Sequence, residues 1–143
     1  MTHAESTQRT QTLARIVGPF LLVAAATVAT RAGSIDLLFP AFFQDAPLVL
    51  ITGVFTLMAG LTMFAAHHHW DTPPAIAISV LGVLTTFRGI VLMLAPAMAA
   101  SLASGVAASP VVPLALAVLV ALLGAWLTFL GWFAKPAQPK APT

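Results

Sequence analysis

Long apolar runs alternate with short polar segments along the whole chain. A helix needs roughly 20 apolar residues to cross the hydrocarbon core of a bilayer. Four segments meet this length, and they cover residues 13–30, 47–66, 74–95 and 111–133. Because short connections make consecutive helices antiparallel, the pattern predicts an all-α, integral membrane four-helix bundle with antiparallel neighbouring spans. We expect residues 1–143 to form a single transmembrane domain with cytoplasmic tails at 1–12 and 134–143.

The first span has a second interpretation. Arg9 and Arg15 flank the start of its apolar run and small residues follow it, which is also the pattern of a cleaved secretory signal peptide. Pro19 is tolerated in a membrane helix, because neighbouring groups can satisfy the carbonyl that it leaves free. The pattern favours a retained anchor, with the cleaved signal peptide as the alternative.

Composition supports the membrane assignment and removes other classes of protein. Of the 143 residues, 59% are hydrophobic and 7% are charged, whereas an ordinary soluble domain has about 25% charged residues. The net charge of +2 arises without a cluster of Lys and Arg. We therefore expect no nucleic-acid partner, and the lipid bilayer is the partner that surrounds the chain. The absence of cysteine excludes disulfides and thiolate chemistry.

The distribution of Lys and Arg predicts the orientation. Arg9, Arg15, Lys135 and Lys140 lie beside the spans on the amino-terminal side, and Arg31 lies on the other side. Cytoplasmic segments carry the excess of Lys and Arg, so both termini are expected to be cytoplasmic.

The two longer connections then face outward. In the first of them, Phe39, Phe42 and Phe43 predict a short interfacial segment, which we expect to be broken by Pro40. The second contains ASLASGV, whose small residues are typical of a flexible linker.

Pairs of glycines seven residues apart recur in three spans. They occur in GVFTLMAG at 53–60, GVLTTFRG at 82–89 and GAWLTFLG at 124–131. Two helical turns separate the members of a pair, so both lie on one face, where small residues allow close helix approach. Around a turn centred at Asp71, Gly53 faces Gly89 and Gly60 faces Gly82, which predicts contact between the second and third spans at two levels. General enrichment of glycine in membrane helices is the alternative for any single pair.

Arg88 places a permanent positive charge inside the third span. It lies about 12 Å along a helix from Pro96, and side chains on a helix lean toward its amino terminus, which here is inward. We therefore expect a partner within the protein, and the candidates are Thr52, Thr85 and above all Asp36. Asp45 is the other acid on this side, but the Asp-Ala-Pro sequence at 45–47 predicts that it caps the second span. In one interpretation, Arg88 has a structural role: it pairs with groups of the protein or anchors the chain to outer-leaflet phosphate. A site for an anionic ligand or headgroup is the other.

The connection between the second and third spans contains HHHWD at 67–71. On a continuing helix only His67 and Asp71 share a face, so the motif does not complete a tetrahedral metal site, and we expect no metal. Structural uses account for each residue: histidines at a helix carboxyl end, Trp70 at the membrane interface, and Asp71 or Thr72 as the N-cap of the next helix. Proton handling, or a metal shared between protomers, is the alternative.

The other polar residues do not form a recognisable catalytic set. The serines considered as nucleophiles, none of which has both a histidine and an acid within reach in the expected fold, are Ser34, Ser79, Ser101, Ser104 and Ser109. No phosphate-binding or dinucleotide-binding motif is present in the sequence. We expect no enzymatic activity and no cofactor.

The third span also carries a resemblance to a protein family. His67-x-x-Trp70 followed by GVLTTFRGIVLMLAP resembles short, uncharacterised bacterial integral membrane proteins, in which an H-x-x-W helix end precedes a G-W-L-T-x-x-K-G span and a terminal proline. The matching residues are Gly82, Leu84, Thr85, Gly89 and Pro96. Val83 replaces the usual Trp, and Arg88 replaces Lys and keeps the charge. The likeness covers roughly residues 47–96 and implies an architecture, with no established activity.

Together these features predict a multi-pass protein of the bacterial inner (cytoplasmic) membrane. We expect a structural or accessory membrane component, present as a homo-oligomer or in a larger membrane complex. The alternative is a small oligomeric transporter or channel-like protein with an anion-binding vestibule at Arg88.

Overall fold

The computed structural model describes residues 3–66, 72–109 and 111–133. The four long helices in this part are α1 (His3–Thr30), α3 (Ala46–Ala66), α4 (Pro73–Leu94) and α6 (Val111–Phe133). Two shorter helices, α2 (Ile35–Gln44) and α5 (Pro96–Ala107), and a 3-10 helix, η1 (Ala32–Ser34), connect them. No strand occurs among these residues. Each long helix contains a segment long and apolar enough to cross a membrane, so the prediction of an all-α protein with four spans is confirmed.

Three of the four predicted spans end within one residue of the observed helices. The exception is α1, which begins at His3 rather than at residue 13. Most of the predicted tail at 1–12 is therefore helical. Hydropathy marks the point where apolar side chains begin, whereas a helix continues for as long as the backbone bonds and residue propensities allow.

Local sequence signals account for the starts of three helices. The Asp45 carboxylate accepts a hydrogen bond of 3.0 Å from the backbone N–H of Leu48, which is the N-cap interaction of α3. Thr72 is extended, and Pro73 opens α4 at a position where the missing N–H has no helical partner to lose. Pro96 opens α5 in the same way.

Both longer connections are helical, which corrects two expectations. α2 continues through Pro40 instead of breaking there. Pro40 removes the backbone bond to the carbonyl of Asp36, and α2 nevertheless continues to Gln44, packed along α5. The segment ASLASGV lies within α5, where the hydroxyl of Ser101 donates to the carbonyl of Met98 at 2.9 Å and that of Ser104 donates to the carbonyl of Ser101 at 2.9 Å.

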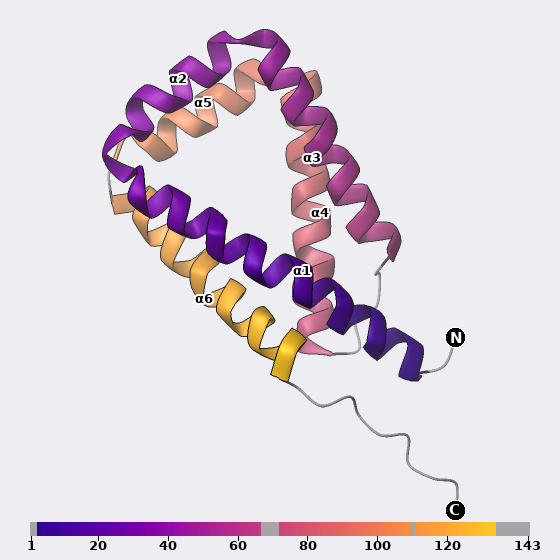
Figure 1. Cartoon of the computed structure of the whole chain (residues 1–143). Coiled ribbons are helices and arrows are strands. Elements are labelled where there is room, and N and C mark those ends of the chain that lie inside the picture. The colour runs from indigo at the N-terminus through magenta and orange to yellow at the C-terminus, as the bar shows by residue number, and fades with distance from the viewer. Residues whose placement is uncertain (1–2, 67–71, 110, 134–143) are drawn as a thin grey trace, which may run out of the picture.

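The helices pack in three antiparallel pairs, each of which joins the first half of the chain to the second half. α1 lies along α6, α2 along α5 and α3 along α4 (Figure 1). α1 therefore packs against the last span and not against the next one in the chain. The two long pairs meet at the end where α1 begins and α6 ends, and they diverge toward the opposite end, where α2 and α5 bridge them (Figure 1).

The buried core lies where the two long pairs meet. Ala14 and Val17 of α1, Ile78 of α4 and Leu127 of α6 form one cluster, and Met63 of α3 packs against it. Ile78 and Leu127 have no exposed surface. All four long helices therefore contribute to a single core at this end of the molecule.

Close contacts at glycines have the same geometry in the two long pairs. Gly18 of α1 lies against Thr128 of α6, and Gly89 of α4 lies against Leu57 of α3. Gly18 and Gly89 are 71 positions apart in the sequence, and so are Leu57 and Thr128. At this offset α1 corresponds to α4, and α3 corresponds to α6.

Two further pairs of glycine contacts follow the same offset of 71 residues. The equivalent contacts are Gly60 with Thr86 and Gly131 with Arg15, and Gly53 with Met93 and Gly124 with Leu22. Identical residues at this offset in α3 and α6 are Ala46 and Ala117, Leu48 and Leu119, Val49 and Val120, Gly53 and Gly124, and Gly60 and Gly131. The two halves of the chain are thus related by a pseudo-two-fold axis, and the glycine motif of α3 corresponds to that of α6.

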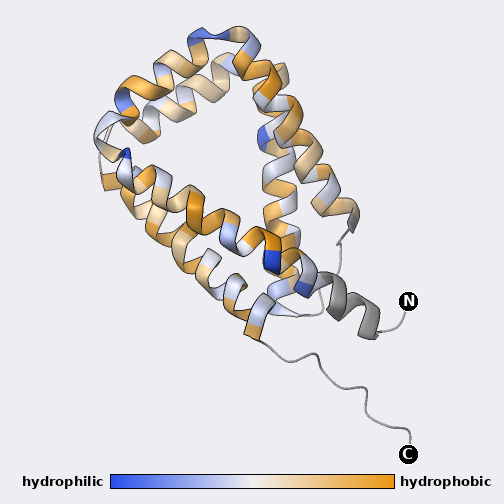
Figure 2. Cartoon of the chain, in the orientation of Figure 1, coloured by the Kyte–Doolittle hydropathy of each residue, from blue (hydrophilic) through white to orange (hydrophobic). Residues whose placement is uncertain are grey.

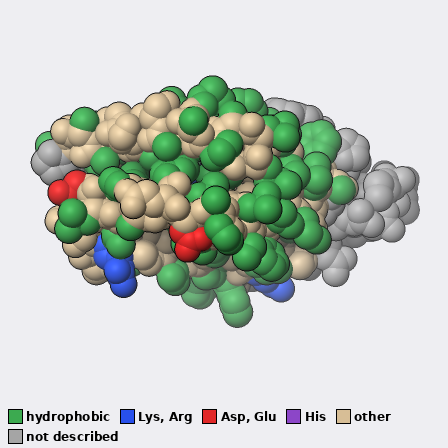
Figure 3. All heavy atoms as spheres, turned by 90° about the horizontal axis from the view of Figure 1, so that it is seen from above, with side chains coloured by type: hydrophobic (Ala, Val, Ile, Leu, Met, Phe, Trp, Pro, Cys, Tyr) green, Lys and Arg blue, Asp and Glu red, His purple; other side chains and the backbone are tan. Residues whose placement is uncertain are grey.

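The outer faces of the long helices are strongly apolar (Figure 2). Phe20 of α1, Phe55 of α3 and Leu119 of α6 expose 68%, 70% and 62% of their surface. In the view onto α2 and α5, charged side chains are few and are set among hydrophobic ones (Figure 3). Such a surface matches lipid, because a soluble protein rarely exposes large contiguous apolar areas.

Candidate ligand-binding cavity

Arg88 lies in α4, six residues before the helix ends at Leu94, which is about 9 Å along the axis. Its side chain is exposed in this chain. Within residues 3–66, 72–109 and 111–133 it has neither a hydrogen bond nor an ion pair. A guanidinium carries five N–H donors and keeps its charge, so Arg88 retains its full capacity to bind an acceptor.

Arg88 lines an open cavity of about 820 Å³ between α2, the first half of α3, the second half of α4, and α5. The polar side chains in the lining are those of Asp45, Thr52 and Arg88, and the aromatic ones are those of Phe39, Phe42, Phe43 and Phe87. Aliphatic residues of α4 and α5 complete the walls. The cavity thus combines a mostly apolar wall with one cation, one carboxylate and one hydroxyl.

The structure brings only one of the three expected partners into the cavity with Arg88. Thr52 lines the cavity, whereas Thr85 and Asp36 do not. Asp36 lines a separate hollow of about 500 Å³ between α2 and α5, together with Ser101 and Ser104. Asp36 and Leu38 both lie in the first turn of α2, but only Leu38 lines the Arg88 cavity, whereas Asp36 lines the other hollow.

Asp45 is a cavity residue that the sequence interpretation assigned only as a helix cap. One of its carboxylate oxygens accepts the N–H of Leu48, as that interpretation expected. The same side chain lines the cavity that Arg88 lines, and the two residues do not form an ion pair. The sequence indicates only that Asp45 is a charged residue at the start of a span. This position does not by itself predict that Asp45 lines a cavity.

The glycines singled out in the sequence lie in the contact between α3 and α4. Gly53, Gly60, Gly82 and Gly89 are all buried. They do not face one another, however. Each glycine lies against a larger residue about one turn from the predicted glycine partner, as Gly60 does against Thr86. A glycine leaves room for a side chain or the backbone of the opposite helix. Each close contact therefore pairs a glycine with a larger residue and not with another glycine.

Two threonines complete these contacts, and the sequence analysis did not identify them. Thr86 of α4 donates its hydroxyl to the carbonyl of Gly82 at 2.8 Å, and Thr128 of α6 donates its hydroxyl to the carbonyl of Gly124 at 2.7 Å. Each hydroxyl is thereby satisfied within its own helix, and the threonine can press against a glycine of the partner helix. The shared pattern G-x-x-x-T-F-x-G in α4 and α6 is the sequence signal for this role.

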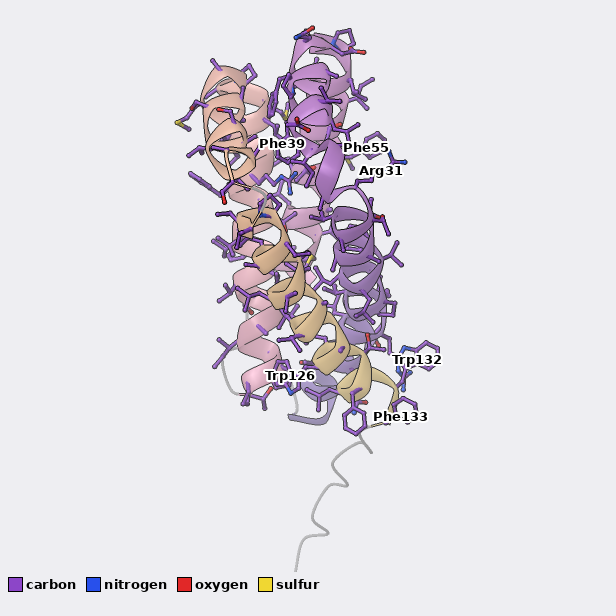
Figure 4. The ribbon with its side chains drawn as sticks, turned by 90° about the vertical axis from the view of Figure 1, so that its left-hand side faces the viewer. Arg31, Phe39, Phe55, Trp126, Trp132 and Phe133 are labelled. Atoms are coloured by element: carbon purple, nitrogen blue, oxygen red, sulfur yellow. The ribbon has the colours of Figure 1, made fainter. Side chains whose placement is uncertain are left out.

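Arg15 joins α1 to the end of α6 at the opposite end of the molecule. Its Nε donates a hydrogen bond of 2.6 Å to the carbonyl of Gly131, and its guanidinium carbon lies 6.0 Å from the centroid of the Trp132 ring. Trp126, Trp132 and Phe133 lie toward this end of α6, whereas Phe39 and Arg31 lie toward the other end (Figure 4). Aromatic rings and a cation gathered at one end are typical of a membrane interface.

The HHHWD motif, with His67, Trp70 and Asp71, lies outside the described residues. In the part of the chain that the structure describes, no group of three His, Cys, Asp or Glu side chains is placed to hold a metal ion.

Comparison with known proteins gives no further assignment: no family model, no curated protein and no solved structure matches the chain. The motif resemblance over residues 47–96 therefore stays a prediction. The fold defines the class as a multi-pass helical membrane protein. Its most distinctive polar feature is the Arg88 cavity at the diverging end of the helix pairs.

Proposed function

We propose that this chain is a small, non-enzymatic protein of the bacterial inner membrane that binds an anionic group in the Arg88 cavity. It acts as a structural or accessory membrane component and not as a catalyst. The observation that carries the proposal is an exposed guanidinium in a mostly apolar cavity, with no described protein partner. Charges within membrane spans are rare, and they mark functional sites or pair with other protein groups.

The proposed orientation places α2, α5 and the cavity on the outer side of the membrane. The start of α1, the end of α6 and the α3–α4 connection then lie on the cytoplasmic side. Two observations support it: Arg15 lies at the proposed inner end together with Trp132, and the end bearing α2 and α5 retains Arg31 as its one cation outside a span. The excess of Lys and Arg beside the termini favours the same direction.

A homo-oligomer or a larger membrane complex is part of the proposal, but its contact surface lies elsewhere than the glycine faces. The glycines of α3 and α4 are buried within the chain. Association would use the exposed apolar faces, such as the one that carries Phe55 on α3. A small oligomeric transporter or channel-like protein, with the cavity as its anion-binding vestibule, is the second candidate, and the open form of the cavity favours it.

The binding proposal is tested with purified protein in detergent. A ligand that binds only the folded state raises the unfolding temperature in proportion to its occupancy. We expect inorganic phosphate or a phosphate-bearing lipid to raise that temperature for the wild type and for Arg88→Lys, and to have much less effect on Arg88→Gln. Arg31→Gln is the matched control, because it removes an exposed cation outside the cavity. Equal stabilisation of the wild type and Arg88→Gln by every anion would refute the proposal.

Flux measurements separate the two candidates. The purified protein is reconstituted in vesicles, and anion efflux is compared between the wild type and Arg88→Gln. Binding without Arg88-dependent flux supports the accessory role. Flux that depends on Arg88 favours the transporter or channel-like candidate.

A further inference from the structure

We propose that Arg15 and Trp132 form a second binding site, which takes the phosphate of an anionic phospholipid from the leaflet around this end of the molecule. Trp132 lies near the end of α6 (Figure 4), and Arg15 reaches it from α1. The Arg88 cavity lies at the diverging end of the helix pairs, so the two sites are independent. Three observations carry the assignment.

The first observation is how the Arg15 guanidinium is held. Its Nε donates to the Gly131 carbonyl at 2.6 Å, and its central carbon lies over the Trp132 ring, 6.0 Å from the centroid. One edge and one face of the planar group are therefore occupied. Arg15 is exposed and makes no other bond to a described residue. Four of its five N–H donors, all on the terminal nitrogens, remain available.

A guanidinium fixed in this way is suited to phosphate. Its two terminal nitrogens present parallel N–H groups, which bind two oxygens of one phosphate at the same time. Because the Gly131 bond and the Trp132 ring already restrict the side chain, less conformational entropy is lost when the ligand binds. Trp132 exposes 63% of its surface, so the site is open to the surroundings of the helix pair.

The second observation is the depth of the site. The apolar span of α1 begins at Thr10, five residues or about 8 Å before Arg15, and the span of α6 ends one residue after Trp132. Side chains on a helix lean toward its amino terminus, which in α1 is the direction of the membrane surface. The guanidinium and the indole therefore lie at the level of the headgroups, where lipid phosphates are found.

The third observation comes from the pseudo-symmetry of the fold. At the offset of 71 residues, Arg15 corresponds to Thr86 and Trp132 corresponds to Leu61. Gly131 lies against the Arg15 backbone as Gly60 lies against the Thr86 backbone. The same helix contact thus forms in the other pair with a short side chain that bonds within its own helix. Close packing of the helices does not require an arginine beside a tryptophan, so this pair is available for another role.

Neighbouring residues favour an anionic lipid as the occupant. Along α1 the nearest ionisable residue is Arg9, about 9 Å away on the helix axis, and the sequence after α6 carries Lys135 and Lys140 without an acid. Such an excess of positive charge attracts a headgroup with a net negative charge more strongly than a zwitterionic one. Beside Trp132, the stacked rings of Phe129 and Phe133 are exposed. They provide an apolar surface for acyl chains, which free phosphate lacks.

The test measures lipid binding to purified, delipidated protein in detergent micelles. All variants are made in an Arg88→Gln background, so that the cavity does not contribute. The probes are phosphatidylglycerol and phosphatidylcholine with identical acyl chains, and inorganic phosphate. Native mass spectrometry gives the bound lipid, and the unfolding temperature without lipid shows whether each variant folds. We expect the parent protein to prefer phosphatidylglycerol over both other probes.

Three substitutions assign the binding to Arg15. Arg15→Gln should weaken phosphatidylglycerol binding about tenfold, the scale of one hydrogen bond to a charged group, and should abolish the preference over phosphatidylcholine. Arg15→Lys keeps the charge without the two-pronged geometry, so it should restore part of the preference. Arg31→Gln is the matched control, because it removes an exposed cation at the other end of the molecule and should change nothing.

A second measurement leaves Arg15 intact and locates the lipid. Phosphatidylglycerol with brominated acyl chains should quench the fluorescence that is lost in Trp132→Phe, and brominated phosphatidylcholine should quench it less. This readout does not depend on whether Arg15 also stabilises the end of α6.

The outcomes are separate from those for the Arg88 cavity. The inference is overturned if Arg15→Gln binds phosphatidylglycerol as its parent does, if Arg31→Gln lowers binding equally, or if both brominated lipids quench Trp132 to the same extent. Inorganic phosphate that binds as tightly as phosphatidylglycerol would overturn the lipid assignment. None of these results bears on anion binding at Arg88, which is tested by comparing Arg88→Gln with the wild type.

Discussion

Gly60 of α3 lies directly against Thr86 of α4, so that a β-carbon at residue 60 would lie 2.5 Å from the Thr86 hydroxyl oxygen. It would also meet the Thr86 backbone, which cannot move without shifting α4. Because Thr86 is held to the carbonyl of Gly82 by its own hydroxyl, rotation of its side chain costs a hydrogen bond. The two helices therefore approach as closely as their backbones allow.

Gly60→Ala should consequently force α3 and α4 apart. We expect a loss of about 1–3 kcal/mol of stability, the usual cost of overpacking, measured as a lower unfolding temperature in detergent. Gly105→Ala is the control, since a β-carbon there would meet nothing within 4 Å. That control should leave stability unchanged or raise it slightly, because alanine favours a helix. Equal effects of the two substitutions would contradict the observed contact.

The pseudo-two-fold relation predicts matching effects in the two long pairs. Gly18→Ala and Gly89→Ala occupy equivalent positions, and in both a β-carbon would come within 2.6 Å of the partner backbone. We expect each to destabilise the protein as Gly60→Ala does, by about 1–3 kcal/mol. Gly82→Ala should cost less, because its nearest neighbours would lie at 3.3 Å. A larger loss for Gly82→Ala than for Gly89→Ala would rule out this helix register.

Arg15→Ala should loosen the end of α6. It removes the hydrogen bond to the Gly131 carbonyl and the contact with the Trp132 ring. We expect a loss of about 1 kcal/mol, the scale of one hydrogen bond at a partly exposed position. Tryptophan fluorescence should change at the same time, and Arg31→Ala, at the other end of the molecule, serves as the control. Fluorescence identical to the wild type would show that Arg15 does not contact Trp132.

Two substitutions at Asp45 separate its role as the helix cap from the effect of its negative charge. Asp45→Ala removes the cap of α3, and we expect it to cost about 1 kcal/mol, whereas Asp45→Asn keeps the hydrogen bond to Leu48. Thermal unfolding of the two variants measures the difference. Equal destabilisation by both would indicate that the charge, and not the cap, stabilises this end of α3.

The absence of cysteine makes the proposed orientation directly measurable. Ser34→Cys places a thiol beside α2, and Thr72→Cys places one at the exposed start of α4. A membrane-impermeant maleimide should label Ser34→Cys in intact cells with an accessible inner membrane, and should label Thr72→Cys only after the membrane is opened. The reverse pattern would invert the topology.

Local features of the fold could be predicted, because each depends on a few consecutive residues. The apolar runs fixed three spans to within one residue, and the Asp-Ala-Pro sequence at 45–47 located the cap of α3. Pro40 was misjudged as a break, because α2 continues through it although the backbone bond to the carbonyl of Asp36 is lost. The start of α1 was also missed, because the polar residues before the apolar run still support a helix.

The candidate site could be predicted only in part. Arg88 stood out from the sequence as a charge within a span, but its expected partner Asp36 lines another hollow, and the acid in the Arg88 cavity is Asp45. Hydropathy is a property of each residue alone, so the sequence by itself determined the helical class, the number of spans and the presence of an unusual charge. Only the tertiary structure decided that α1 pairs with α6, that each glycine faces a larger residue, and that Arg88 opens onto a cavity. Those features depend on how helices that are distant in the sequence pack against each other. The sequence of one helix does not specify the surface of the helix that packs against it.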